Sequence, residues 1–129
     1  MNKLNIPETY FTPRVEFNSE KGILESEGRV LETDKGTDED IFTKVSVWVD
    51  EYSNDNKDPM TIRFRLSYYN TTSSKKMVKF MRNVEGLFQK GHDIKMEWEY
   101  EDGDEDALTD GEIFKNLFTV PFNVTRVKN

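Results

Sequence analysis

The sequence contains no cysteine and a single histidine, His92, among its 129 residues. Without cysteine there is no disulfide, no thiol nucleophile and no thiolate metal site. One histidine cannot complete a zinc site or a Cys-His pair either, because those sites draw on several such ligands. His92 follows Gly91, at which we expect a helix to end, and we interpret it as a turn residue.

Long apolar runs and phosphate-binding glycine motifs are also missing. No stretch approaches the length of a membrane-spanning helix, and MNKLNIPETYFTP at the start lacks the apolar run of a signal peptide. The patterns G-x-G-x-x-G, G-x-x-x-x-G-K and G-x-S-x-G do not occur. We therefore expect a soluble, cytoplasmic protein that is not an enzyme and uses no cofactor.

Basic residues are too few to balance the acidic ones. The formal net charge is −7, from 25 acidic and 18 basic residues. A surface of this sign repels nucleic-acid phosphates and anionic membranes, so neither is an expected partner. Protein partners are left as the open class.

What the chain does contain is enough aromatic side chain for a core. Nine Phe, five Tyr and two Trp argue against disorder, and 129 residues are the usual size of one domain, which we expect to span 1–129. Alternating apolar and polar residues predict strands at 10–17, 23–31, 60–68, 92–100 and 122–127. Apolar residues at helical spacing predict three helices, with stripes over 41–52, 77–88 and 113–118. Trp48 and Trp98 lie on such stripes and are expected in the core.

Three helix starts have capping signals. Thr37 precedes the first helix, Ser73 or Ser74 precedes the second, and TDGE (109–112) has the spacing of a capping box before the third. The predicted fold is a single small α/β domain in the order β-β-α-β-α-β-α-β, with a mixed sheet of about five strands. Because the strands alternate, we expect helices mainly on one face and charged side chains on the other, which favours a monomer.

The acidic segment EWEYEDGDEDALTDGE (97–112) has carboxylates that could form a metal site. With the EF-hand pattern placed at Asp102, Ala107 falls at the required glycine and Ile113 at the bidentate glutamate, so the pattern fails. We interpret the segment as a solvated loop that leads into a helix N-terminus, where acidic side chains are favourable. A weak site for a divalent cation is the alternative, and our prediction is that the chain holds no metal.

The segment YYNTTSSKK (68–76) has more hydroxyl groups than a turn requires. Asn70 would end a strand, and Ser73 or Ser74 would cap the next helix, which leaves the other hydroxyls unexplained. A hydroxyl at a helix N-terminus is well placed for phosphorylation, because free N–H groups and the helix dipole stabilise a phosphate there. The residues alone do not select which hydroxyl is modified.

Several segments together resemble the SiaC family of bacterial regulatory phosphoproteins. They are IPETYFTPRVEF, VWVDEY, LSYYNTTSSKK, EWEYEDGDED and VPFNV, in the order of the family. The resemblance implies a small α/β fold similar to anti-sigma-factor antagonists. Two features depart from the family pattern: VLETDKGTDED stands where S-x-P-E-N is common, and Thr72 stands where serine is usual.

In that family, the threonine directly after the asparagine is phosphorylated, and the resemblance carries this role to Thr71, with Thr72 as its rival. It implies a protein kinase of the histidine-kinase-like ATPase type and a SpoIIE-like serine/threonine phosphatase as partners. It also implies that the unphosphorylated form activates a diguanylate cyclase, in a partner-switching pathway of cyclic di-GMP signalling and biofilm control. We expect partners to bind around this segment, at Tyr69, Asn70, Thr71, Thr72, Ser73, Ser74, Lys75 and Lys76.

Two alternatives to this hypothesis are open. One is a constitutive adaptor, in which the hydroxyl segment only caps a helix. The other is a small divalent-cation-dependent enzyme that uses the acidic segment.

Overall fold

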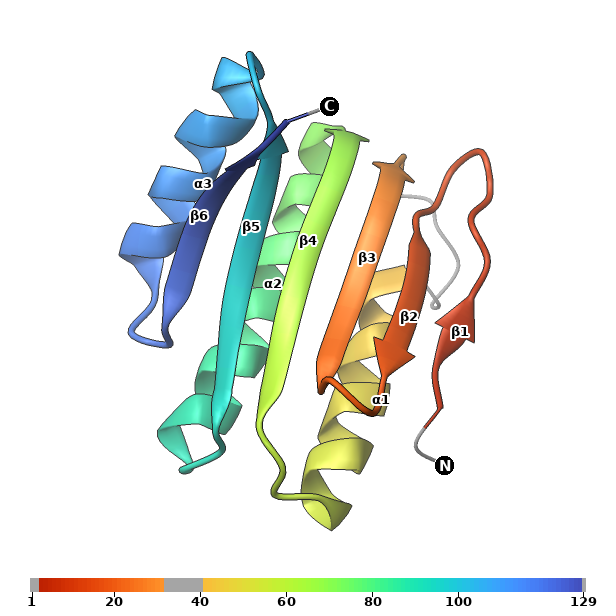
Figure 1. Cartoon of the computed structure of the whole chain (residues 1–129), viewed down its shortest axis with the longest axis vertical. Coiled ribbons are helices and arrows are strands. Elements are labelled where there is room, and N and C mark those ends of the chain that lie inside the picture. The colour runs from red at the N-terminus through yellow and green to blue at the C-terminus, as the bar shows by residue number, and fades with distance from the viewer. Residues whose placement is uncertain (1–2, 32–40, 129) are drawn as a thin grey trace.

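The computed structural model describes residues 3–31 and 41–128, which form six strands and three helices (Figure 1). The strands are β1 (Asn5–Ile6), β2 (Arg14–Asn18), β3 (Ile23–Val30), β4 (Met60–Tyr69), β5 (Ile94–Glu101) and β6 (Phe122–Val127). The helices are α1 (Ile41–Asp55), α2 (Thr71–Gln89) and α3 (Glu105–Leu117). Within the described ranges, no helix is long and apolar enough to cross a membrane.

The strands lie in the sheet in the same order as in the chain. β1, β2 and β3 are antiparallel neighbours, whereas β3, β4, β5 and β6 run parallel. Each helix connects two parallel strands, and all three helices cover one face of the sheet (Figure 1). The predicted α/β class, mixed sheet and single helical face are confirmed. The strand count is six instead of about five, because β1 has two residues and is too short to show alternation.

Some predicted boundaries were wrong. The strand expected at 10–17 begins at Arg14, because the residues before it form a turn in which the Thr9 hydroxyl accepts the N–H groups of Phe11 and Thr12. The third helix begins at Glu105 instead of at the TDGE box, and Asp104 caps it by accepting the Ala107 N–H at 3.1 Å. The expected cap Thr37 lies outside the described residues.

The core lies between the sheet and the helices. Trp98 of β5 is 1% exposed, packs against Phe64 and Phe114, and donates its Nε1–H to the Ala107 carbonyl at 2.9 Å. Trp98 is therefore a core residue, as expected, and it fixes α3 to the sheet. Trp48 of α1 is half-buried and packs against this core from its edge.

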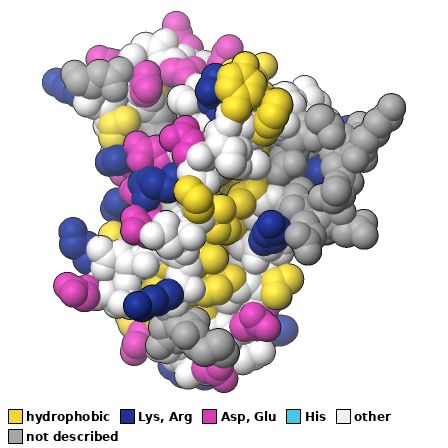
Figure 2. Space-filling model, turned by 90° about the vertical axis from the view of Figure 1, so that its right-hand side faces the viewer, with side chains coloured by type: hydrophobic (Ala, Val, Ile, Leu, Met, Phe, Trp, Pro, Cys, Tyr) yellow, Lys and Arg dark blue, Asp and Glu magenta, His cyan; other side chains and the backbone are white. Residues whose placement is uncertain are grey.

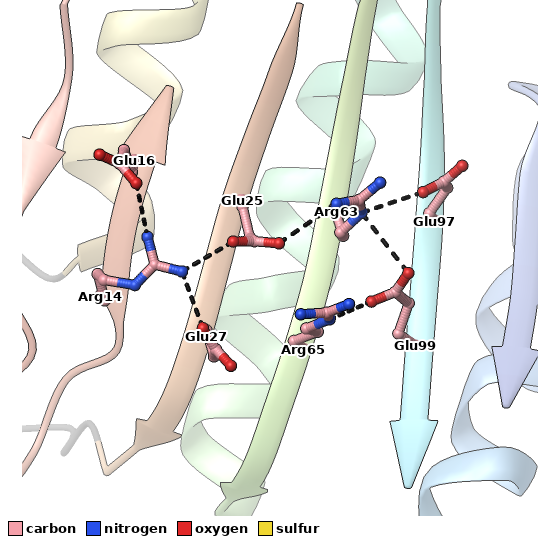
Figure 3. Close-up of polar contacts among 8 residues, drawn as sticks. All are labelled: Arg14, Glu16, Glu25, Glu27, Arg63, Arg65, Glu97 and Glu99. Atoms are coloured by element: carbon pink, nitrogen blue, oxygen red, sulfur yellow. Dashed lines mark hydrogen bonds and ion pairs between the residues drawn. The ribbon is translucent and has the colours of Figure 1, made fainter. Parts of the chain in front are cut away.

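The opposite face of the sheet is covered by ion pairs instead of helices (Figure 3). The network joins β2, β3, β4 and β5 through Arg14, Glu16, Glu25, Glu27, Arg63, Arg65, Glu97 and Glu99. Burial would raise the pKa of Glu25, but hydrogen bonds from Arg14 and Arg63 outweigh it and hold that pKa below its usual value. The prediction of a charged open face is confirmed for the described residues.

The alternation of β4 changes at its carboxyl end. Gly28 of β3 pairs with Leu66, and the next residue, Arg29, pairs with Tyr68, so Ser67 has no partner in the register. One extra residue in a strand moves the following side chains to the opposite face. Unbroken alternation over the predicted strand 60–68 would place Tyr68 on the apolar face with Leu66, and that placement is wrong: Tyr68 is 54% exposed.

Candidate functional site

Residues 71–76 of the hydroxyl-rich segment YYNTTSSKK (68–76) form the first two turns of α2, and Asn70 is the N-cap. Asn70 has an extended backbone, and its Oδ1 accepts the Ser73 N–H at 2.8 Å. Its carbonyl accepts the Ser74 N–H at 2.9 Å, which closes the first helical turn. The prediction that Ser73 or Ser74 is the cap was therefore wrong. Asparagine is among the strongest N-cap residues, so its position directly after β4 was the signal for this role.

Ser73 serves as an anchor between α2 and the sheet. It is fully buried, and its hydroxyl donates to the Val30 carbonyl at the end of β3, at 2.9 Å. Val30 also pairs with Tyr69, the last residue of β4. Because a buried carbonyl needs a donor, this hydrogen bond fixes the start of α2 against β3. It also withdraws the Ser73 side chain from contact with any partner.

The remaining hydroxyl residues differ in exposure. Thr71, the first residue of α2, is exposed, whereas Thr72 and Ser74 are half-buried. The N–H groups of Thr71 and Thr72 have no acceptor within the helix, since the first turn of an α-helix lacks one. Lys75 is exposed and Lys76 half-buried on the next turn. Of the four hydroxyl residues 71–74, Thr71 is thus the exposed one, and it lies at the positive end of the α2 dipole.

Tyr69 connects the start of α2 to α3. Its hydroxyl donates to Asp110 Oδ2 at 2.6 Å, and its ring lies edge-on to Trp98 with ring centroids 5.7 Å apart. Burial raises the pKa of the Tyr69 phenol well above its usual value, and the Asp110 carboxylate raises it further. Tyr69 is therefore a neutral hydrogen-bond donor at physiological pH. Together with Ser73, it holds the α2 N-terminus between β3 and α3.

A hollow of about 410 Å³ opens beside this junction. It is lined by Ser67, Tyr68, Tyr69, Asp104, Asp106, Ala107, Thr109 and Asp110. Its aromatic wall depends on the register shift at Ser67, so the sequence pattern gave no signal for it. The hollow is acidic, and its lining combines the carboxyl end of β4 with the first two turns of α3.

Two further aromatic side chains reach solvent at the same end of the sheet. Tyr10 and Phe11 are 63% and 59% exposed and pack edge to face. The Phe11 carbonyl accepts the Leu31 N–H at 2.8 Å, just beyond β3, and the Arg29 guanidinium lies 4.4 Å from the Tyr10 ring centre. Figure 2, which views the molecule from the side of β1, shows hydrophobic side chains exposed on that side. Sequence alternation had placed Phe11 inside a strand.

Residues of the acidic segment (97–112) and His92 have structural roles in the fold. Asp104 caps α3, and Asp110 accepts the Tyr69 hydroxyl. Among the residues that the structure describes, no three side chains of His, Asp or Glu are grouped so as to hold a metal ion. His92 follows the end of α2, where its N–H donates to the Leu87 carbonyl at 3.1 Å.

The fold is that of a small α/β protein, and the family comparison assigns it to a class of regulatory proteins. The family model for the SiaC family regulatory phosphoproteins matches residues 6–127, and the chain belongs to this family. The resemblance inferred from the sequence is confirmed.

Solved structures and a curated relative agree with this assignment. SiaC of Pseudomonas aeruginosa is 26% identical, with a TM-score of 0.83 and coverage of 98% of this chain and 100% of that chain. Another match is the crystal structure of the diguanylate cyclase SiaD in complex with its activator SiaC, from the same organism. Its matched chain is 27% identical, with a TM-score of 0.83 and coverage of 96% and 99%. An uncharacterized protein of Pseudomonas aeruginosa strain UCBPP-PA14 is 27% identical over 124 residues, which are 96% of each chain.

These similarities bear on the question of catalysis. The family is one of regulatory proteins, and the solved SiaC is an activator of a cyclase. The expectation that this chain is not an enzyme is thereby confirmed.

Proposed function

We propose that this protein is a non-catalytic switch in a bacterial partner-switching pathway, in which reversible phosphorylation of Thr71 controls the binding of protein partners. The observation that carries the proposal is the exposure of Thr71 at the first position of α2, next to neighbours that are half-buried or engaged in structure. Membership of a family of regulatory phosphoproteins supports it.

Accessibility favours Thr71 over Thr72 as the acceptor. A protein kinase must bring the γ-phosphate of ATP in line with the attacking hydroxyl, which requires the acceptor side chain to enter the active site of the kinase. Thr71 is exposed, whereas Thr72 is half-buried on the first turn. A phosphate on Thr71 would carry a charge of about −1.5 to −2 and would lie at the helix N-terminus, where free N–H groups stabilise it. Phosphorylation would thus change the charge of the surface without unfolding the helix.

The proposed effector is a diguanylate cyclase, because the relative SiaC is the activator of the cyclase SiaD. In this scheme the unphosphorylated protein binds and activates the cyclase, which would connect the switch to cyclic di-GMP and biofilm formation. A kinase of the histidine-kinase-like ATPase type would add the phosphate, and a SpoIIE-like phosphatase would remove it. The proposed partner surface includes the exposed and half-buried side chains of Tyr69–Lys76, without that of Ser73.

The test is phosphotransfer by the cognate kinase with ATP, followed by mass spectrometry. We expect one phosphate per chain, located at Thr71 by fragmentation, and no phosphate on Thr71→Ala. Thr72→Ala is the matched control and should accept phosphate at the wild-type stoichiometry. Undiminished phosphorylation of Thr71→Ala would show that the acceptor is a different residue.

The consequence for binding requires a separate measurement. The affinity of the unmodified and the phosphorylated protein for the diguanylate cyclase should be compared by calorimetry, with Thr71→Ala carried through the same kinase treatment. We expect the phosphorylated protein alone to lose affinity. Equal affinities would favour the constitutive adaptor, in which the hydroxyl segment has only a structural role.

A further inference from the structure

The helix α3 carries a surface that the structure leaves uncovered. It lies next to α2 at the end of the helical layer (Figure 1). Two of its large apolar side chains, Ile113 and Leu117, are 52% and 48% exposed. They are four residues apart, so they lie one turn from each other on the same side of the helix. Covering two adjoining, half-exposed apolar side chains would remove apolar area from water, which favours association with a partner.

The same side of α3 continues into the acidic hollow. Residues four, seven and eleven positions after Asp106 fall on one stripe of an α-helix, which runs through Asp106, Asp110, Ile113 and Leu117. Asp106 and Asp110 line the hollow of about 410 Å³, and Tyr68, which is 54% exposed, forms part of its wall. The stripe is therefore acidic at its N-terminal end and apolar at its C-terminal end. We refer to Tyr68 and this stripe as the α3 surface.

Charge identifies what this surface can accept. With its cap, α3 has five carboxylates and one lysine: Asp104, Glu105, Asp106, Asp110, Glu112 and Lys115. No arginine or lysine is among the described residues that line the hollow. An acidic ligand would be repelled, whereas a guanidinium group could pair with Asp106 and stack on the Tyr68 ring. The hollow is within the size range of ligand pockets, about 300–1,000 Å³, so an arginine side chain fits it.

We propose that the α3 surface is a docking site for a basic amphipathic helix of a protein partner. An arginine of that helix would occupy the hollow beside Tyr68 and Asp106. Its apolar side chains, one to two turns away, would cover Ile113 and Leu117. This mode combines charge complementarity with the burial of an apolar stripe, as helix-in-groove recognition does. It needs no phosphate at Thr71, so it stands or fails independently of the proposed switch.

The experiment uses a synthetic probe and the full-length, ¹⁵N-labelled protein. The probe is a capped 15-residue alanine-based helix with two arginines one turn apart and two leucines one turn apart on the same face. We expect saturable shifts of amide resonances in α3 and at Tyr68. A control peptide with both leucines moved to the opposite face should bind about fivefold more weakly or less, because it cannot cover the apolar pair.

Two double variants on different helices separate this site from general attraction to an acidic protein. Asp106→Asn with Ile113→Ser removes one carboxylate and one exposed apolar side chain, and should weaken probe binding about tenfold. The matched control is Glu51→Gln with Val47→Ser on α1, where Val47 is 52% exposed and Glu51 exposed. The control pair should leave binding within about twofold of wild type.

Other outcomes would overturn the proposal. Equal weakening by both pairs, or shifts spread over acidic residues of all three helices, would mean that the probe senses only net charge. Binding that is unaffected by the α3 pair, or shifts confined to another face, would place the basic site elsewhere. The circular dichroism spectrum of each variant must match that of wild type; should Asp106→Asn unfold α3, Asp106→Glu with Ile113→Ser replaces it and is expected to lose about fivefold, through the apolar side chain alone.

Discussion

Two glycines within helices should respond to alanine in opposite directions. Gly86 lies in α2 and Gly111 in α3, and neither has a positive φ. A Cβ atom added at Gly86 would meet no other atom within 4 Å. A Cβ atom added at Gly111 would lie 2.5 Å from Trp98 Cδ1 and 3.1 Å from Val124 Cγ1. The two substitutions are chemically identical, so the difference between them isolates the packing of α3 on Trp98.

The magnitudes follow from helix propensity and steric overlap. Alanine is favoured over glycine in a helix interior by about 1 kcal/mol, so Gly86→Ala should stabilise the protein by about 0.5–1 kcal/mol. At Gly111 the same gain is opposed by overpacking, which costs about 1–3 kcal/mol in a close-packed core. Trp98 cannot move away freely, because it is 1% exposed and its indole N–H is bonded to the Ala107 carbonyl. We therefore expect a net destabilisation of about 1–2 kcal/mol for Gly111→Ala.

Chemical denaturation in urea, followed by circular dichroism and by tryptophan fluorescence, gives both free energies of unfolding. The midpoint should rise for Gly86→Ala and fall for Gly111→Ala, with the same slope as wild type. If Gly111→Ala were as stable as wild type, the close contact between α3 and Trp98 would be wrong. The position of α3 in the lining of the hollow would then be wrong as well.

Three further predictions concern the start of α2 and the open face. Asn70→Ala should lower the free energy of unfolding by about 1 kcal/mol through loss of the helix cap, as measured by thermal denaturation. Asn70→Asp, which retains a cap, should stay close to wild type in the same measurement. Ser73→Ala leaves the Val30 carbonyl without its donor and should cost about 1–3 kcal/mol; an unchanged urea midpoint would contradict the anchor. Burial would raise the pKa of Glu25, yet hydrogen bonds from two arginines lower it, so its stabilisation is present above the unfolded pKa of about 4.3 and is lost as pH falls through the folded value. Unfolding midpoints measured between pH 6 and 3 should therefore fall less steeply for Glu25→Gln than for wild type.

The sequence predicted the sheet well where one physical rule determines the pattern. In β4, Ile62 and Phe64 face the helices, whereas Arg63 and Arg65 carry the ion pairs of the open face. Such alternation can be read from residue letters, because it reflects burial of one face only. The segments between the strands are long enough for crossovers, which is why the parallel pairing was also predictable.

The errors arose where a single hydrogen bond or one extra residue changes the pattern. At Ser67, one residue without a register partner turns Tyr68 outward and Tyr69 inward, and alternation carries no signal for such a shift. At Thr9, a side-chain hydroxyl closes a turn in a stretch that otherwise alternates like a strand. For α3, the letters TDGE fit a capping box, but Asp104 lies five residues before that box and already caps the helix. Where two sequence signals for the start of a helix are of similar strength, tertiary contacts determine which one is used.

The residues at the start of α2 have separate structural roles. Asn70 closes the first turn of α2, and Ser73 binds the end of β3, so the helix start is fixed without any contribution from the Thr71 hydroxyl. Tyr69 fixes the same junction from the side of α3. A modification of Thr71 would therefore alter the charge of the surface and leave the fold beneath it in place. Under the proposed switch, partners would distinguish two states of one unchanged structure.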